Sequence, residues 1–200
     1  MGPGNGSGAI NWSAMTPRTA SGGTGSPPTV RRCLPPLGGD ATGPDPTNRA
    51  KRGTKRHVLS DRRGVPLSAV VSAANRHDMK LAEDTLDGVV VARPMPTPEA
   101  PQQLCRDKGF DFPATRTAAE ARGYVVHTPH RGVETPTPPP ETRHPARRWV
   151  IERTNSWHNR FRKLKIRYEK KAANYLGLVQ FACFLIVYRA RVTLHRWVFG

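Results

Sequence analysis

Glu152 lies inside the strongly basic segment 147–171, whose only other acidic residue is Glu169, near its end. Basic side chains precede and follow Glu152, at Arg147, Arg148, Arg153, Arg160, Arg162, Lys163, Lys165 and Arg167. Arg148 comes four residues before Glu152, so in a helix the two side chains share a face and can touch. A carboxylate in this setting is either part of a surface ion pair or a metal ligand beside a nucleic-acid backbone.

Apolar residues alternate with these charges at spacings of mostly three and four, which predicts a helix with one buried side. They are Trp149, Ile151, Trp157, Phe161 and Leu164. The aromatic rings among them could stack on unpaired bases. Their helical spacing favours packing in the core.

The charge balance points to a polyanionic partner. The 200 residues contain 32 Lys and Arg against 15 Asp and Glu, a formal net charge of +17. Residues 147–200 hold 13 of the basic residues and only two Glu, so the positive charge is concentrated. Nucleic acid is the leading candidate, because each neutralised phosphate releases a counterion.

Cysteine spacing excludes a zinc knuckle and a disulfide framework. Cys33, Cys105 and Cys183 lie far apart, with no CxxC pair and no His at ligand spacing, which favours a reducing compartment. The N-terminus does not resemble a signal peptide. The apolar segment 175–188 is too short to span a bilayer, so we expect a buried helix and no membrane partner.

Composition divides the chain into two parts. Residues 1–48 are rich in Gly, Pro, Ser and Thr, and we expect them to be disordered. Residues 49–200 are expected to form one domain. It begins with a hairpin of strands 55–60 and 65–74, whose turn is 61–64.

A helical pattern over 79–91 follows this hairpin, with Asp78 as its N-cap. The segment 104–111 starts as a strand, and the C-terminal end of that strand presents Asp107. A helix over 114–122 then leads to a strand over 124–127. The basic helix and a last helix, 172–197, complete a mixed α/β sheet with flanking helices.

Five segments, in order from about Gly38 to about Arg191, resemble the DDE transposases of bacterial insertion sequences. The segments are GPDPTNRAKRGTKRHVLSDRRGVPL, ANRHD, RDKGFDFPATR, RRWVIERTNSWHNRFRKLKIRYEK and NYLGLVQFACFLI. Within that family they resemble the branch whose third acidic ligand lies in an Arg-x-x-x-Glu helix.

The resemblance implies a ribonuclease-H-like core in which two Asp and one Glu bind two Mg²⁺ or Mn²⁺ ions. Matched by motif, Asp107 corresponds to the second ligand, Glu152 to the third, and Arg148 to the signature arginine. Such a site cleaves phosphodiesters and transfers strands. The resemblance also implies binding of double-stranded DNA at transposon ends and targets, a possible homodimer, and a cytoplasmic, nucleoid-associated protein. We expect Arg148, Arg153, Arg160, Arg162, Lys163 and Lys165 to contact the DNA.

The chain departs from the family at the first ligand. The family's first Asp falls within 26–32, and no acidic residue precedes Asp40. Asp40, Asp45 and Asp61 are available substitutes, and each is better explained as a loop or turn residue. The signature Tyr is replaced by Pro145 and the signature Lys by Asn159.

These departures predict that the first strand is missing or degraded and that the chain is an inactive remnant of a transposase. The alternative is a basic DNA-binding protein without chemistry. A ribosomal-type RNA-binding protein fits the charge but not the RDKGFD segment.

Overall fold

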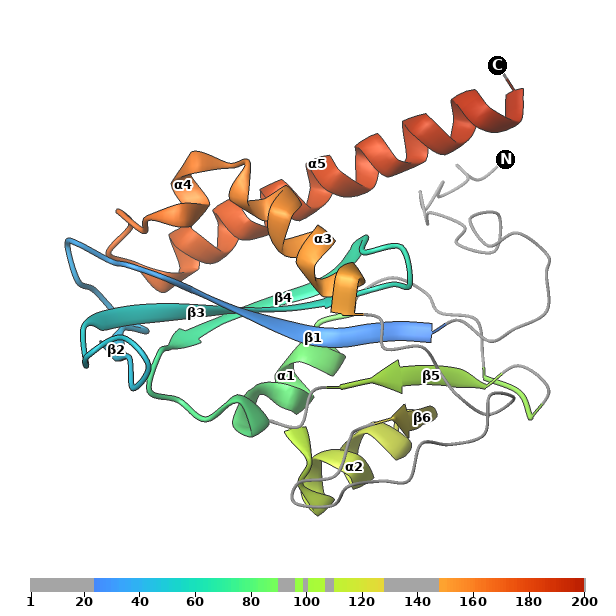
Figure 1. Cartoon of the computed structure of the whole chain (residues 1–200), viewed down its shortest axis with the longest axis horizontal. Coiled ribbons are helices and arrows are strands. Elements are labelled where there is room, and N and C mark those ends of the chain that lie inside the picture. Colours follow the sequence, from blue (N-terminus) through green and yellow to red (C-terminus); the bar gives the residue numbers. More distant parts are fainter. Residues whose placement is uncertain (1–23, 90–95, 99–100, 107–109, 128–147, 200) are drawn as a thin grey trace, which may run out of the picture.

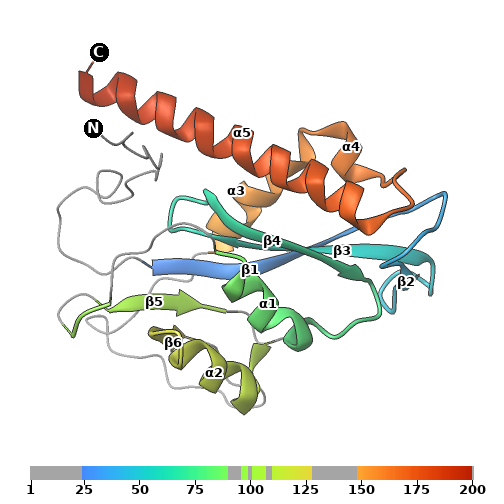
Figure 2. The same cartoon turned by 180° about the vertical axis from the view of Figure 1, so that it is seen from behind.

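The computed structural model describes residues 24–89, 96–98, 101–106, 110–127 and 148–199. Within these ranges, the side chains of residues 24–31, 148–149, 151 and 194–199 are outside the description. The described chain forms a six-stranded mixed sheet with helices on both faces (Figures 1 and 2). This confirms the predicted mixed α/β class.

The sheet combines an antiparallel part with a parallel part. Its order is β2-β3-β1-β5-β6, with β4 paired to β3. The strands are β1 (Thr24–Cys33), β2 (Gly43–Pro44), β3 (Arg52–Ser60), β4 (Pro66–Ala73), β5 (Gln102–Cys105) and β6 (Tyr124–His127). β1 is the strand that joins the two parts, because it is antiparallel to β3 and parallel to β5.

β1 overturns part of the sequence prediction. We expected residues 1–48 to be disordered and the first strand to be missing, but residues 24–33 form a strand inside the sheet. Pro27 and Pro28 misled the prediction, because proline cannot donate a ladder hydrogen bond. The pairing of β1 with β3 shifts between Ser26 and Thr29, so the two prolines lie at a bulge. The predicted disorder of residues 1–23 falls outside the described residues.

The helices form two layers. On one face of the sheet lie α1 (Ala82–Asp87) and α2 (Pro113–Glu120), and on the other lie α3 (Arg148–Asn159), α4 (Arg162–Lys165) and α5 (Ala172–Phe199) (Figures 1 and 2). Each face has its own buried cluster. Under α3–α5 it comprises Cys33, Leu164, Tyr175, Val179 and Ala182. Under α1 and α2 it comprises Leu59, Leu86, Leu104, Ala119 and Tyr124.

The predicted hairpin and the strand over 124–127 are confirmed, whereas two predicted helices are divided. The pattern over 79–91 becomes the 3-10 turn η2 (Asp78–Leu81) followed by α1, and the N-cap is His77 instead of Asp78. The basic helix breaks after Asn159 because Phe161 adopts an extended conformation. This break allows the chain after α4 to pair Ile166 with Leu34 beyond the end of β1.

α5 is not the fully buried helix that we expected. One side packs on β4 through buried residues that include Val179 and Ile186. The other side exposes Phe181, Phe184 and Tyr188, whose neighbouring rings stack at centroid distances of 6.4 and 6.3 Å. By length and composition alone, the 22 residues Ala172–Thr193 could cross a membrane, with a mean hydropathy of 1.4 in an 18-residue window. Core helices of soluble proteins meet the same criterion, so the absence of a membrane partner stays a prediction.

Arg167 joins three distant parts of the chain although its side chain is fully buried. Its guanidinium donates to Asp40 Oδ1 (3.2 Å), to Thr54 Oγ1 (2.9 Å) and to the carbonyls of Glu169 (2.8 Å) and Lys170 (2.9 Å). Asp40 Oδ1 also accepts from the backbone N–H of Ala172 (2.6 Å), at the start of α5. The guanidinium therefore holds the 38–41 loop, β3 and the entry to α5 together.

Gly39 makes this junction possible. Its φ is +110°, and an added Cβ would lie 2.2 Å from the carbonyl oxygen of Lys170. Only glycine fits a position that combines this conformation with so close a backbone approach. The Gly38-Gly39-Asp40 segment thus connects the sheet to α5.

Replacing Arg167 with Met should lower the free energy of unfolding by about 3 kcal/mol, because buried carbonyls and the Thr54 hydroxyl lose their donor. Arg162→Met is the matched control, since Arg162 is exposed and a surface change costs within about 0.5 kcal/mol. Urea unfolding followed by circular dichroism measures both losses. Equal losses would contradict the role assigned to Arg167.

Two buried histidines should make the fold acid-sensitive. Burial lowers the pKa of His57 and of His158 to about 4 each. The unfolded chain, with a His pKa near 6.5, binds protons first as the pH falls, so stability is lost between about pH 6.5 and pH 4. The expected loss at pH 5 is about 1 to 2 kcal/mol for each histidine.

Imidazole proton resonances should report this directly. His57 Nε2 lies 3.2 Å from Ser72 Oγ, and His158 Nε2 lies 3.3 Å from Cys183 Sγ. In the folded protein both rings should stay neutral down to about pH 5. Titration of these two resonances near pH 6.5 would show that the rings are not buried as described.

Candidate nucleic-acid interface and catalytic site

The three elements that should carry acidic ligands are neighbours in the structure. β1 runs parallel to β5, with Thr24 opposite Gln103 and Gly25 opposite Leu104. Asp107 follows β5 after one intervening residue and lies outside the described residues. On the other side, α3 packs against β1 and carries the exposed Glu152 in its second turn. The fold therefore brings together β1, β5 and α3, the elements that contain or directly precede the expected ligand positions.

A buried arginine anchors the end of β5. Arg106 donates to the carbonyl oxygen of Thr115 in α2 at 2.8 Å. The Thr115 hydroxyl in turn donates to the carbonyl oxygen of Phe110 at 2.7 Å. Asp111, the other carboxylate of the RDKGFD segment, pairs with Arg116 of α2 at 3.6 Å. The residues on both sides of 107–109 are thus held by α2.

Asp40 has a structural role in the 38–41 loop. Its Oδ1 accepts hydrogen bonds from Arg167 and from the first residue of α5. It lies in the 38–41 loop, outside the strands. The interpretation of Asp40 as a loop residue is therefore confirmed.

Asp45 and Asp61 stabilise turns. Asp45 accepts from the N–H and the hydroxyl of Thr47 and pairs with Arg32 at 3.2 Å. Burial alone would raise its pKa, but these hydrogen bonds and the Arg32 charge outweigh burial and lower it. Asp61 Oδ1 accepts from the N–H groups of Arg63 and Val65, both at 2.8 Å, while burial raises its pKa. Both are turn residues, as predicted.

Within the described ranges, no three His, Cys, Asp or Glu side chains come together in a group that could bind a metal ion. The family implies a divalent metal. Among the described carboxylates, Asp40, Asp45 and Asp61 are engaged in loop or turn contacts. Glu152, on α3, lies at the position that the resemblance assigns to the third ligand.

The basic residues that we expected to contact DNA are exposed wherever their side chains are described. They are Arg153, Arg160, Arg162, Lys163 and Lys165, on α3, α4 and the turn between them. We call this set the α3–α4 basic face. Arg148 begins α3, but its side chain is outside the description. Arg167 belongs to the same sequence segment but is buried and cannot contact DNA.

The β3–β4 turn contacts α3 at the two residues that follow Glu152. The Thr154 hydroxyl donates to the Gly64 carbonyl at 2.8 Å, and the Arg153 guanidinium donates to the Arg63 carbonyl at 3.5 Å. Gly64 has φ +85°, and an added Cβ would lie 3.1 Å from Thr154 Oγ1. Sequence reasoning missed this contact and with it Arg63, because the contacting residues are 90 positions apart in the chain.

Comparison with known proteins agrees with this geometry. Residues 28–186 match the family model described as "Transposase DDE domain". A putative transposase for insertion sequence element IS402 from Burkholderia cepacia is 32% identical over 152 residues, which cover 72% of this chain and 67% of that protein. No solved structure matches.

The matched region begins inside β1 and ends within α5, so it includes the sheet, the RDKGFD segment and the Arg-x-x-x-Glu helix. The chain therefore belongs to the family of transposase DDE domains found in insertion sequences.

Proposed function

We propose that this chain binds double-stranded DNA as an insertion-sequence transposase and that its catalytic site lacks the first carboxylate. The observation that carries the proposal is the adjacency of β1, β5 and α3, the three elements on which the family places its acidic ligands. The sheet order, with β1 between an antiparallel and a parallel part, supports a ribonuclease-H-like core.

The register of β1 and β5 indicates where the missing carboxylate belongs. Thr24 pairs with Gln103 and Gly25 with Leu104. The offset between these paired positions relates Pro28 to position 107 in the sequence, beyond the described end of the pairing. Pro28 lies within 26–32, where the sequence comparison places the family's first Asp, and beside the bulge in β1. We therefore assign the vacant ligand position to Pro28.

Asp107 and Glu152 are the proposed remaining catalytic and metal-binding residues, with Arg148 four residues before Glu152 in the sequence. A divalent cation, Mg²⁺ or Mn²⁺, would supply Lewis-acid activation of the attacking oxygen and stabilise the leaving oxygen. Two carboxylates offset less of the charge of two divalent ions than three do. Metal occupancy, and with it strand cleavage and transfer, should therefore be low in this chain.

A non-catalytic DNA-binding protein is the second candidate. One observation favours it: Asp40, Asp45 and Asp61 are all engaged in loop or turn contacts, so none replaces the missing ligand. Both candidates need the α3–α4 basic face. They differ once the missing carboxylate is restored: only a transposase site would then cleave DNA, and Glu152→Gln would abolish that cleavage. The homodimer and the nucleoid-associated location stay predictions.

DNA affinity should fall steeply with salt, and the α3–α4 basic face should set the slope. Each phosphate contact contributes about −0.9 to the slope of log K against log salt. Lys163→Gln should therefore reduce the magnitude of the slope by about 1. The matched control is Lys80→Gln, which removes the same charge from the exposed Lys80 of η2, at a different element. Equal slopes for both variants would contradict this assignment of the DNA-binding face.

Restoring a carboxylate at Pro28 should restore cleavage. We expect Pro28→Asp to nick supercoiled plasmid in Mg²⁺, at a rate at least tenfold above the unmodified chain. The gain should disappear in Pro28→Asp combined with Glu152→Gln. The control Thr29→Asp adds the same charge at the next residue of β1, which the register does not assign to the ligand, and should give no gain.

The comparison of these variants separates the two candidates. No gain in Pro28→Asp, in a protein that still binds DNA, would show that the missing carboxylate is not the only defect. It would favour the non-catalytic candidate. A gain of the same size in Thr29→Asp would contradict the register assignment.

A further inference from the structure

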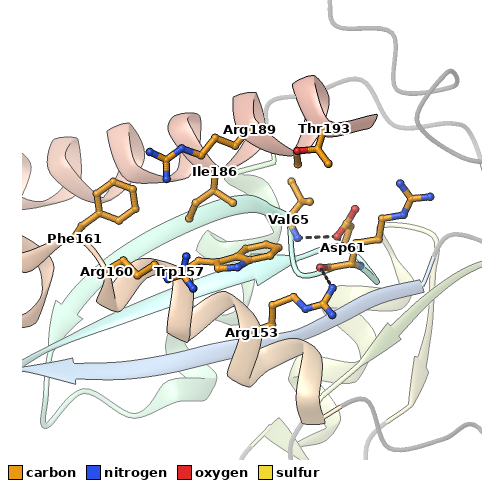
Figure 3. Close-up of a pocket in the computed structure, with 11 residues that line it drawn as sticks. Asp61, Val65, Arg153, Trp157, Arg160, Phe161, Ile186, Arg189 and Thr193 are labelled. Atoms are coloured by element: carbon orange, nitrogen blue, oxygen red, sulfur yellow. Dashed lines mark hydrogen bonds between the residues drawn. The ribbon is translucent and has the colours of Figure 1, made fainter. Parts of the chain in front are cut away.

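A cavity of about 580 Å³ opens between the β3–β4 turn, α3 and α5 (Figure 3). Its walls come from parts of the chain more than 100 residues apart. The lining residues are Asp61, Arg63, Val65, Arg153, Trp157, Arg160, Phe161, Ile186, Arg189, Ala190 and Thr193. A volume of this size suits a small organic ligand.

Four arginines line this cavity against one carboxylate. Arg63 comes from the turn, Arg153 from α3, Arg160 from the residue after α3, and Arg189 from α5. With Asp61 ionised, the lining carries a net charge of +3. Arginine binds phosphate bidentately through its planar fork of N–H donors. The cavity therefore favours a phosphorylated ligand.

Most of the other lining residues are apolar. Trp157 lies in the middle of the cavity, with Ile186 projecting from α5 toward it (Figure 3). Phe161 completes this apolar part of the lining beside Arg160. The Arg153 guanidinium carbon lies 5.9 Å from the Trp157 ring centroid. Aromatic rings beside arginines are the combination that stacks on a nucleobase while binding its phosphate.

The walls are held in place before any ligand binds. Asp61 fixes the turn through the N–H groups of Arg63 and Val65. Hydrogen bonds from Thr154 and Arg153 hold this β3–β4 turn against α3. Ile186 is 7% exposed and belongs to the packed face of α5. A preformed site of this kind loses little conformational entropy on binding.

We propose that this cavity binds a nucleoside phosphate, with the base against Trp157 and the phosphate at Arg160 and Arg189. The nucleoside phosphate could come from two sources. One is an unpaired nucleotide at a DNA end, and for this source the inference rests on the proposed DNA binding. The other source is a free nucleotide, which has the same chemistry and needs no DNA.

Arg189→Gln and Arg191→Gln form a matched pair. Both arginines are exposed on α5, two residues apart, but only Arg189 lines the cavity. The probes are a blunt 20-base-pair duplex, the same duplex with a three-nucleotide single-stranded tail, and free dAMP. Affinities are measured by fluorescence anisotropy for the DNAs and by calorimetry for dAMP.

The tailed duplex should bind about tenfold more tightly than the blunt one, as expected for one stacked base. Arg189→Gln should remove most of that difference, whereas Arg191→Gln should change it by less than about twofold. Trp157→Leu should weaken the preference as Arg189→Gln does, and Trp157→Phe should retain part of it. Binding of dAMP that Arg189→Gln weakens, with no effect of the tail, assigns the site to free nucleotides.

The result that overturns the proposal is duplex binding with no preference for the tail, no dAMP binding, and equal effects of Arg189→Gln and Arg191→Gln. The proposed DNA-binding function would survive that result. Failure of every DNA to bind at low salt would instead overturn the proposed function, and dAMP binding would then test the cavity alone.

Discussion

The arrangement of the C-terminal helices over the sheet depends on one buried cation, Arg167. Its guanidinium reaches the 38–41 loop, β3 and the backbone before α5, and its carbon lies 5.5 Å from the centroid of the Tyr175 ring. Burying a cation is costly unless donors and acceptors are matched, and here carbonyls, a hydroxyl and Asp40 provide the match. Because α4 ends two residues before Arg167, the same network sets where the basic residues of α3 and α4 lie.

A second constraint is the pair of prolines in β1. A strand between β3 and β5 should have both edges paired, yet Pro27 and Pro28 supply no N–H. The bulge between Ser26 and Thr29 takes up this mismatch on the β3 side. The same two residues lie where the family places its first acidic ligand. In the proposed function, the loss of the carboxylate and the irregularity of the strand are one local feature, and the rest of the sheet persists around it.

Short-range patterns were enough to predict much of the fold. The hairpin around Asp61, the strand over 124–127 and the mixed sheet follow from alternation, turn residues and glycine positions. The patterns failed where tertiary contacts decide. β1 was missed because two prolines argue against a strand, and the break at Phe161 was missed because no helix-breaking residue marks it. The exposed side of α5 was missed because its apolar residues occur on all sides of the helix.

The candidate site was predictable to a similar extent. The exposure of Arg153, Arg160, Arg162, Lys163 and Lys165 was predicted from charge and spacing, and so was the turn role of Asp61. The cavity at Trp157 was not predictable, because Arg63 and Arg189 approach it from the hairpin and from α5. Asp107 was assigned by motif alone and lies outside the described residues.

The central claim is that this chain keeps the transposase fold and its basic face but lacks a complete set of acidic ligands. Strand cleavage by the unmodified protein tests it most directly, with a duplex carrying the insertion-sequence ends as substrate and Mg²⁺ or Mn²⁺ present. The account predicts a stable protein–DNA complex and no metal-dependent cleavage above background. Metal-dependent cleavage that disappears in Asp107→Ala would contradict it, because the site would then be complete without a carboxylate in β1.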